Sequence, residues 1–379
     1  MKIIVATALY PPEIESLATY SQDVVRYLQK NHQVSILAYA NQVEKSEGLN
    51  ILALSKRQPL WLRLFNYTRK LFSLAKKADL IYVQNSVAVG LPVIIVKLFS
   101  KTPVVINFAE DEAWKRASSL HLTSKSYNSF LRSHRSNKRT RLIMKLQGWI
   151  LRQASAVIAP SETLVKIISD VYGLSEQRVF VNYIAEDKKI RLPFLASKTK
   201  QQIFTIGTLV DWSGIADIIE AFATVQKDFP ESKLVISGDG PAKDKFQRIA
   251  HDLGIVEKVK FLGKVSQAQN YYLRQSSALY VYNLKANDFS HGISQGWLAG
   301  LPVVAAATDV AQEIVADYGG ALLFEVDNKD DLAKKIGQIF SDNELSNKLT
   351  AQAKENLDKR FSWSAHIKKL NSIFELLLK

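Results

Sequence analysis

Cysteine is absent from the 379-residue sequence. Disulfides, thiol nucleophiles and thiolate metal sites are therefore excluded, and the composition suits a reducing cytosol. The longest apolar run, residues 87–99, is interrupted by Pro92 and Lys97. Because a membrane-spanning helix needs about 20 apolar residues, this run is expected to form a buried helix. The first residues are expected to form a strand that enters a turn, which is a poor signal peptide.

Motifs of several other chemistries are also missing. The six histidines show no i, i+4 pairs, so a metal site is not expected. The sequence contains no Asp-x-Asp motif, no Gly-x4-Gly-Lys-Ser/Thr loop, no nucleophile elbow and no Gly-x-Gly-x-x-Gly turn after its first apolar run. These absences argue against metal-dependent sugar transfer, P-loop hydrolysis, hydrolysis by an elbow nucleophile and dehydrogenation. Neither a resident cofactor nor a metal is expected.

The net charge of +14 is distributed unevenly. Residues 1–190 contain 27 Lys and Arg against 14 Asp and Glu, whereas residues 191–379 contain 23 against 22. The excess in the first half predicts an anionic partner there. A solvated basic face without a partner, or a basic proteome, is the alternative explanation.

Apolar runs rich in Val and Ile alternate with amphipathic helical stretches in the first half. Several of these runs are apolar throughout, which is typical of a parallel sheet covered by helices on both faces. The expected strands are residues 2–8, 34–39, 51–54, 79–84, 104–108, 156–159 and 179–182. The expected helices are residues 17–30, 60–77, 87–100, 129–153 and 161–171.

A polar stretch, residues 186–202, precedes a second series of the same kind. Its expected strands are residues 203–206, 233–237, 259–262, 279–282, 303–306 and 321–324. Its expected helices are residues 215–229, 241–253, 267–275, 291–299, 309–317 and 330–340. Two such series predict an α/β protein with two Rossmann-like, doubly wound domains that face each other across a ligand-binding cleft. The expected domains are residues 1–190 and 200–362, with a helix over 363–379 that packs back on the first domain.

One glycine-containing segment, SGDGP at residues 237–241, ends an expected strand and opens a helix. Glycine lets a backbone approach a ligand closely, and the amino end of a helix attracts anions. Gly238, Asp239 and Gly240 are therefore candidate ligand-binding residues. A tight strand–helix turn without a ligand is the alternative interpretation.

Four further segments surround this one in a fixed order. They are Gly207-Thr208-Leu209, Trp212-Ser213-Gly214, Leu262-Gly263 and AGLPVVA at residues 299–305. The pattern resembles family 4 of the retaining glycosyltransferases, which have the GT-B fold. That family reads Gly-Arg-Leu, Lys-Gly, Gly-Asp-Gly-Pro, Phe-x-Gly and then a Glu-x7-Glu segment before Gly-x-Pro-Val-Val. The resemblance covers nearly the whole chain.

The resemblance implies roles for particular positions. In such enzymes the Arg and Lys hold the donor diphosphate, the first Glu contacts the sugar, and the second Glu contacts the nucleotide ribose. The matching positions here are Thr208, Ser213, Asn287 and Gln295, and none of them is charged. A hydrogen bond to a charged group contributes roughly 1.5–3 kcal/mol. Loss of both cations would therefore cost about 3–6 kcal/mol of transition-state stabilisation, on the order of 10²–10⁴ in rate.

The amino-terminal loop shows a related departure. Residues 10–14, YPPEI, resemble the opening loop of the family, which is normally followed by two glycines near the phosphates. Pro12 and Glu13 lie in this loop, while Glu15 and Ser16 occupy the glycine positions. A carboxylate at Glu15 would repel a phosphate, and its side chain would occupy the space through which the phosphate approaches.

Several polar residues offer partial compensation. Ser290 and His291 open an expected helix whose free N–H groups would attract an anion, although His291 could equally cap or pack. Asp111 follows the expected strand 104–108, where it would orient an acceptor hydroxyl or simply start a solvated helix. The cations that would replace the missing charges are Lys264, Lys285 and Arg274, each of which is also explained as an ordinary surface residue.

Residues 132–152 combine basic and apolar side chains. The candidate membrane or anion patch consists of Arg135, Lys138, Arg139, Arg141, Lys145 and Trp149. A basic helix with an aromatic anchor lies well on an anionic membrane, and an ordinary helix packed on the sheet is the alternative. Residues 60–77 form a second such stretch. Nucleic acid would fit the charge, but no recognition motif supports it.

Two functions follow from these patterns. The first is a cytoplasmic glycosyltransferase with an altered donor site, peripheral to the membrane, which uses a nucleotide sugar and acts on a lipid-linked or other glycan acceptor of the cell envelope. The second is a non-catalytic relative of such enzymes that binds a nucleoside diphosphate, a partner, a glycan or a membrane.

Overall fold

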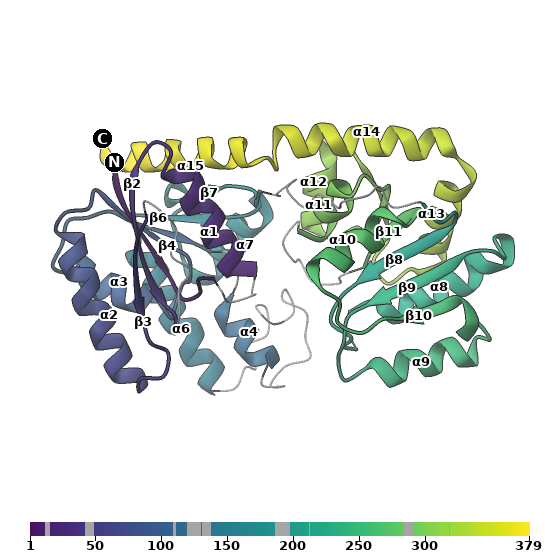
Figure 1. Cartoon of the computed structure of the whole chain (residues 1–379), viewed down its shortest axis with the longest axis horizontal. Helices are drawn as coiled ribbons and strands as arrows, with labels where there is room; N and C mark the ends of the chain where they lie inside the picture. Colours follow the sequence, from purple (N-terminus) through teal and green to yellow (C-terminus); the bar gives the residue numbers. More distant parts are fainter. Residues whose placement is uncertain are drawn as a thin grey trace. The chain divides into compact units, whose positions relative to one another are not determined.

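The computed structural model of the chain contains two compact units (Figure 1). Unit 1 comprises Met1–Thr123, Ser133–Tyr183 and Trp363–Lys379, and unit 2 comprises Ser124–Arg132 and Ile184–Ser362. The structure describes residues 1–11, 16–41, 49–108, 111–119, 130, 138–185, 198–211, 213–283, 291–317 and 319–379.

The described strands of unit 1 form one parallel, seven-stranded sheet in the order β3-β2-β1-β4-β5-β6-β7. Its strands are β1 (Lys2–Thr7), β2 (Gln33–Tyr39), β3 (Asn50–Leu54), β4 (Leu80–Val83), β5 (Val104–Asn107), β6 (Ala156–Ala159) and β7 (Val179–Val181). Every residue of β4, β5 and β6 is buried. Central strands of this kind are apolar on both sides because helices cover both faces of the sheet.

The helices of unit 1 divide between the two faces of this sheet. They are α1 (Ser16–Leu28), α2 (Leu60–Ala75), α3 (Gly90–Lys97), α4 (Glu112–Ser119), α6 (Lys138–Gln153), α7 (Glu162–Tyr172), the 3-10 turn η1 (Glu176–Arg178) and α15 (Trp363–Leu378). The connection through α1 runs along the strand order in the direction opposite to those through α2, α3, α6 and α7. Because such crossovers are right-handed, α1 covers one face and the other four cover the opposite face.

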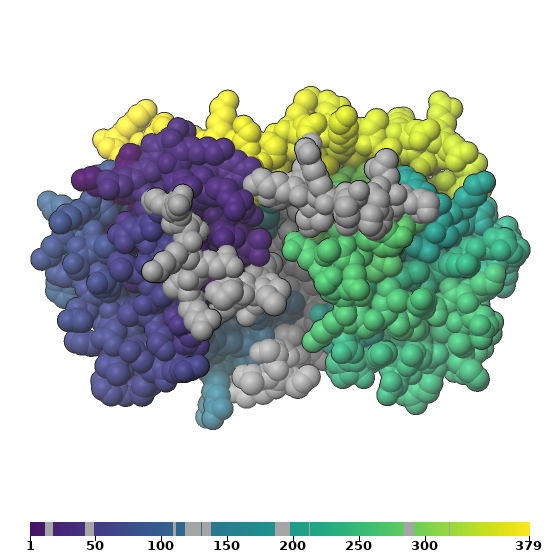
Figure 2. Space-filling view, viewed as in Figure 1, coloured from purple at the N-terminus to yellow at the C-terminus, as the bar shows by residue number. Residues whose placement is uncertain are grey.

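The carboxyl-terminal helix α15 packs on α1 in unit 1 (Figures 1 and 2). The Trp363 ring stacks on Tyr27 at 4.9 Å between centroids. His366 is 2% exposed, and its Nδ1 lies 2.7 Å from the Tyr183 carbonyl. A carbonyl only accepts, so Nδ1 carries the proton and Nε2 accepts from Tyr20 Oη at 2.8 Å. Burial lowers the pKa of His366 to about 4.

The described strands of unit 2 form a second parallel sheet, with six strands in the order β10-β9-β8-β11-β12-β13. Its strands are β8 (Gln202–Ile206), β9 (Lys233–Ser237), β10 (Val259–Phe261), β11 (Leu279–Tyr282), β12 (Val303–Ala306) and β13 (Ala321–Phe324). Its helices are α8 (Ile215–Asp228), α9 (Lys243–Asp252), the 3-10 turn η2 (Val256–Lys258), α10 (Gln267–Gln275), α11 (His291–Leu298), α12 (Asp309–Ala316), α13 (Lys329–Ser341) and α14 (Asn343–Lys359).

The predicted fold class is confirmed, since both units are parallel, doubly wound α/β structures. Helix α6, within the predicted helix 129–153, is described from Lys138 onward, and residues 131–137 lie outside the described residues. Two described helices were absent from the predicted set. One is α4, whose start near Asp111 was considered only as an alternative to an acceptor site. The other is α14, which was not predicted because its sequence is mostly polar and only Leu349, Ala353, Asn356 and Leu357 are buried. Within the described residues no helix combines the length and apolarity that crossing a membrane requires.

Candidate functional site

The strand order of unit 2 changes direction between β8 and β11. The connections from β8 through β9 to β10 run one way along the sheet, and those from β11 through β12 to β13 run the other way. Ligands of open α/β sheets bind at such a switch point, beyond the carboxyl ends of the strands. The loop at residues 207–214 leaves β8 there, and Asn283 leaves β11 there. The candidate site is built from these residues and their neighbours.

Two predicted glycines hold the loops of the candidate site together by close backbone packing. The Gly238 N–H donates to Gly263 O at 2.9 Å. A Cβ atom on Gly238 would lie 1.8 Å from Gly207 O, and a Cβ atom on Gly240 would lie 2.4 Å from Leu209 O. The space that a side chain would need at both positions is filled by the protein's own backbone. The tight turn therefore requires both glycines, with or without a ligand.

Gly207 differs from these two glycines because no atom lies within 4 Å of a Cβ placed on it. The adjacent Thr208 is exposed. Asp239 lies on the facing loop, where its carbonyl accepts the Leu209 N–H at 3.1 Å and its carboxylate accepts the Gly240 N–H at 3.0 Å. A ligand at this edge would meet open backbone and an uncharged hydroxyl.

Ser213, at the position of the family's lysine, has a different environment. The residue is 5% exposed, and its hydroxyl donates to Val210 O at 2.7 Å. Its N–H donates to the same carbonyl at 3.0 Å. The hydroxyl therefore closes the turn that leads into α8.

Asn283, directly after β11, ties that strand end to the turn that leads into α8. Sequence reasoning missed this residue. Its Nδ2 donates to Gly214 O at 3.0 Å and to Asp217 Oδ2 at 3.1 Å, and the residue is 3% exposed. Gly214 has φ 70°, and a Cβ atom on it would lie 2.2 Å from Asn283 O. Asn283 Oδ1 has no hydrogen-bond partner among the described residues. The only signal in the sequence was a polar residue directly after an apolar strand.

Helix α11 lies unusually close to β11. A Cβ atom on Gly292 would lie 2.0 Å from the Tyr282 ring, and one on Gly296 would lie 2.6 Å from the Tyr280 ring. Glycines four residues apart share one face of a helix, so the two aromatic rings pack directly on the helix backbone. This contact fixes the amino end of α11 beside the carboxyl end of β11.

Gln295 on α11 is held by a buried cation. Arg274 on α10 is 5% exposed, and its Nη1 donates to Gln295 Oε1 at 2.6 Å. Its Nε approaches Asn270 O at 3.5 Å. Of the three cations considered from the sequence, Arg274 thus lies beside a predicted site residue. Lys264 is exposed and follows Gly263, whose carbonyl holds Gly238.

The predicted acceptor-side carboxylate, Asp111, lies in the interior of unit 1. It is 2% exposed, its Oδ1 accepts the Trp114 N–H at 3.0 Å at the start of α4, and its Oδ2 accepts the Tyr172 hydroxyl. A role on an acceptor hydroxyl stays a prediction. The neighbouring Glu112 accepts from Ser86 Oγ at 3.0 Å, and burial raises its pKa.

The remaining predicted residues fall into two groups. Some lie outside the described residues or have side chains outside them: Pro12, Glu13, Glu15, Ser16, Arg135, Lys285, Asn287, Ser290 and His291. The others are exposed on α6: Lys138, Arg139, Arg141, Lys145 and Trp149.

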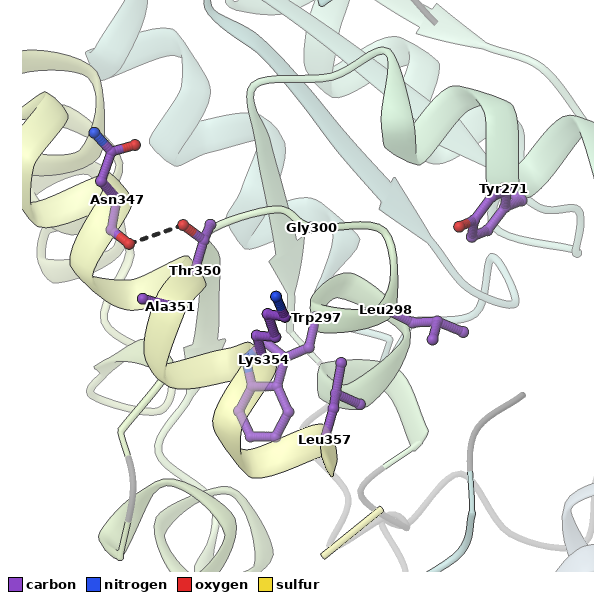
Figure 3. A pocket seen from close by; sticks show the side chains of 9 residues that line it. All are labelled: Tyr271, Trp297, Leu298, Gly300, Asn347, Thr350, Ala351, Lys354 and Leu357. Carbon is purple, nitrogen blue, oxygen red and sulfur yellow. Dashed lines mark hydrogen bonds between the residues drawn. The ribbon is translucent and has the colours of Figure 1, made fainter. Parts of the chain in front are cut away.

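A cavity of about 540 Å³ opens elsewhere in unit 2 (Figure 3). It is lined by the end of α11, including Trp297 and Leu298, and by α14, including Asn347, Lys354 and Leu357. Because α11 begins at the candidate site, this cavity lies at the opposite end of that helix. In the described part of the chain, no three His, Asp or Glu side chains are grouped as a metal site would require.

Comparison with known families accounts for almost the whole chain. Residues 17–184 match the model described as Glycosyltransferase Family 4, and residues 186–356 match that described as Glycosyl transferases group 1. An uncharacterised glycosyltransferase of Methanocaldococcus jannaschii is 23% identical over 100% of this chain and 99% of its own length. The α-monoglucosyldiacylglycerol synthase of Streptococcus pneumoniae is 24% identical over 95% of this chain and 84% of its own length.

Solved structures agree on the fold. The Anabaena protein HepE in complex with UDP superposes with a TM-score of 0.77 at 19% identity, over 100% of this chain and 99% of its own. A glycosyltransferase from Rickettsia africae superposes with a TM-score of 0.72 at 16% identity, over 100% and 98%. The chain belongs to the family 4 glycosyltransferases and has their GT-B fold of two Rossmann-like domains.

Proposed function

We propose that this chain transfers a sugar from a nucleotide-sugar donor to a hydroxyl acceptor, and that the donor binds at the switch point of unit 2. The open backbone at Gly207 beside the exposed Thr208 hydroxyl is the observation that carries this proposal. A diphosphate needs such room, and the crowded Gly238 and Gly240 fix the loops around it. HepE, which has the same fold, has been crystallised with UDP and with UDP-glucose.

The proposed donor site binds without the family's positive charges. Thr208 and the backbone N–H groups of the two loops would donate to the diphosphate, and the amide of Gln295, positioned by Arg274, would contact the ribose. A neutral hydrogen bond contributes roughly 0.5–1.5 kcal/mol, against roughly 1.5–3 kcal/mol for one with a charged partner. Replacement of two charged contacts by neutral ones loses about 2–3 kcal/mol, so transfer should be slower than in an enzyme with both cations by on the order of 10²-fold. The proposed reaction uses no metal or other cofactor.

Relatives support an acceptor carried on lipid or on envelope glycan. One is named for the synthesis of α-monoglucosyldiacylglycerol. Another is the lipopolysaccharide core biosynthesis glycosyltransferase LpsE of Rhizobium meliloti, 24% identical over 56% of this chain and 62% of its own length. Both names describe glycosylation of membrane-associated molecules, so the same class of acceptor is proposed here.

A second candidate function is nucleotide binding without transfer. The observation in its favour is Ser213, whose hydroxyl is bonded within its own turn at 2.7 Å and is 95% shielded from solvent by that turn and its surroundings. If this second function is correct, no side chain at position 213 neutralises a departing diphosphate, and the protein binds a nucleotide without transferring a sugar.

The test combines ligand binding with turnover. Thermal shift against nucleoside diphosphates and nucleotide sugars should show stabilisation that follows RT ln(1 + [L]/Kd), and hydrolysis or transfer of the best donor should be detectable. Binding without any turnover supports the second candidate. Neither binding nor turnover with any common nucleotide sugar contradicts both.

A restored variant tests the assigned positions. Thr208→Arg, Ser213→Lys, Asn287→Glu and Gln295→Glu together should tighten donor binding by at least about tenfold. Thr208→Arg alone avoids the buried Ser213 and should give part of that gain. The control, Gln247→Arg with Asn347→Lys, adds the same two positive charges to exposed positions of α9 and α14 and should change nothing. Equal gains in both would refute the positional assignment.

A further inference from the structure

Three helices of unit 1 carry no acidic residue. The sequences of α2, α3 and α6 contain neither Asp nor Glu. Their basic residues are Arg63, Arg69, Lys70, Lys97, Lys138, Arg139, Arg141, Lys145 and Arg152. The outer surfaces of helices in soluble proteins usually mix both signs of charge. One sign across three helices indicates a surface adapted to an anionic partner.

These helices are neighbours on one face of the sheet of unit 1. Helix α2 packs beside α3, and α3 packs beside α6 (Figure 1). Lys97 Nζ on α3 donates to Gln153 O at the end of α6 at 2.5 Å. A Cβ atom on Gly90 would lie 2.9 Å from the Ile150 side chain, so α3 and α6 are in close contact. The outward sides of α2, α3 and α6 therefore form one surface, here called the basic face.

The basic face also exposes large apolar side chains. Trp61 is 71% exposed, Phe99 75% and Leu142 68%. Eight of the fourteen exposed large hydrophobic residues of the described chain lie on these three helices or directly after α3: Leu60, Trp61, Phe65, Ile95, Leu98, Phe99, Leu142 and Trp149. Exposed apolar residues concentrated on one face, rather than scattered singly, mark an interaction site.

The order of residues along α2 matches a lipid–water interface. Trp61 and Phe65 are one turn apart on its exposed side, and Arg69 and Lys70 follow on the next turn. Trp rings favour the headgroup level of a bilayer, and Lys and Arg are attracted to anionic headgroups. Nucleic acid would use the charges and the rings, but it offers nothing to the exposed leucines at positions 60, 98 and 142, which partition into acyl chains.

We propose that the basic face docks on the surface of an anionic lipid bilayer. Trp61, Phe65 and the exposed leucines enter the interface, while Arg69 and Lys70 contact the anionic headgroups together with the exposed basic residues at positions 138–145 of α6. The proposal is independent of the donor site, because lipid binding is measured without any sugar transfer.

The test is flotation of the full chain with vesicles of phosphatidylcholine, and with vesicles in which about a third of the lipid is phosphatidylglycerol. The chain should float only with the anionic vesicles. Trp61→Ser with Phe65→Ser should weaken binding at least about tenfold, since two anchoring rings are lost. Arg69→Glu with Lys70→Glu should weaken vesicle binding more than the Trp61/Phe65 variant does. High salt should weaken vesicle binding of the unchanged chain in the same way. Brominated lipid should quench the Trp61 fluorescence that a Trp61→Leu variant lacks.

Matched controls lie on unit 2. Leu253→Ser with Val256→Ser removes apolar side chains that are 43% and 47% exposed, and Lys334→Glu with Lys348→Glu reverses two exposed charges. Neither pair should change flotation. No flotation, equal flotation with both kinds of vesicle, or equal losses in the controls would overturn the proposal. Self-association that the Trp61/Phe65 variant abolishes without lipid would also overturn it, because it would assign the basic face to a second copy of the chain.

Discussion

Glycine and positive charge are concentrated in opposite halves of the chain. Twelve of the sixteen glycines follow residue 190, whereas residues 1–190 have 27 basic residues against 14 acidic ones. At the candidate site of unit 2, backbone packs on backbone at Gly238 and Gly240, and the space beside Gly207 is open. In unit 1 two carboxylates follow strand β5, Asp111 and Glu112, and both accept hydrogen bonds from groups inside the unit.

In the two proposals, the units would bind their ligands in different ways. Unit 2 brings main-chain groups to its sheet edge, and such groups bind through shape and hydrogen bonds with little dependence on salt. Unit 1 satisfies its buried polar groups internally and carries its surplus charge on helix surfaces, where salt screens it. Binding by unit 2 should therefore respond to changes of backbone space, and binding by unit 1 to changes of charge.

The largest expected effect comes from filling backbone space in unit 2. Gly238→Ala places a Cβ atom 1.8 Å from Gly207 O at φ 130°, so both a clash and backbone strain oppose it. We expect a loss of about 3 kcal/mol or more in the free energy of unfolding, together with loss of nucleotide binding. Urea denaturation measures the first and thermal shift the second.

Gly254→Ala is the matched control for this change. Gly254 has φ 69° with no atom within 4 Å of an added Cβ, so only the strain applies. It should cost about 1 kcal/mol and leave binding unchanged. Similar losses in the free energy of unfolding for both variants would show that the close packing of Gly238 on Gly207 does not contribute to stability.

The second effect tests the buried polar groups of unit 1. His366 has a pKa of about 4 in the folded chain, below the ordinary 6.5. Between these values the unfolded chain binds a proton that the folded chain does not, so stability is present above pH 6.5 and is lost as the pH falls toward 4. Unfolding measured at about pH 7.5 and about pH 5 should differ by about 2 kcal/mol from this group.

The histidine variants separate this contribution from other pH effects. His366→Gln should remove the pH-dependent part, whatever its own cost to stability. His251→Gln should retain it, because the His251 side chain is 80% exposed. A pH dependence that survives in His366→Gln would mean that another group is responsible.

The smallest expected effect tests whether recognition in unit 2 depends on backbone rather than on charge. Lys264 is the exposed cation beside the glycine loops of unit 2. If recognition there depends on backbone, Lys264→Ala should weaken nucleoside diphosphate binding by no more than about fivefold at physiological salt. Lys260→Ala, an exposed lysine on β10, is the control. A loss of a hundredfold at Lys264 alone would show that this lysine has replaced the missing cations.

The fold was largely predictable because the composition of its buried strands identifies them in the sequence. The mostly apolar runs at 104–108 and 303–306 coincide with β5 and β12 to within one residue, since a strand buried on both faces has few polar side chains. Helix α14 was missed because only four of its residues are buried, too few to impose a strong periodic pattern.

The candidate site was less predictable because its decisive contacts join distant side chains. The sequence identifies Gln295 by its place before Gly300, but it does not show that Arg274, 21 residues earlier, donates to it. Asp111 was expected to face a ligand because it follows a strand, yet the Tyr172 hydroxyl, 61 residues away, holds its carboxylate in the interior. Spacing along a chain predicts backbone turns far better than it predicts side-chain partners.

Helix α15 has a consequence for how the protein is made. It is translated after every other described element of the two units, and it supplies the Trp363 ring that stacks on Tyr27, the His366 that bonds Tyr20, and the Phe374 that packs on Tyr82 at 5.5 Å between centroids. Unit 1 therefore emerges from the ribosome first with these tyrosines uncovered, while unit 2 is already complete in sequence at Ser362. Unit 1, which begins before unit 2 along the chain, can therefore complete its packing only after unit 2 has been synthesised.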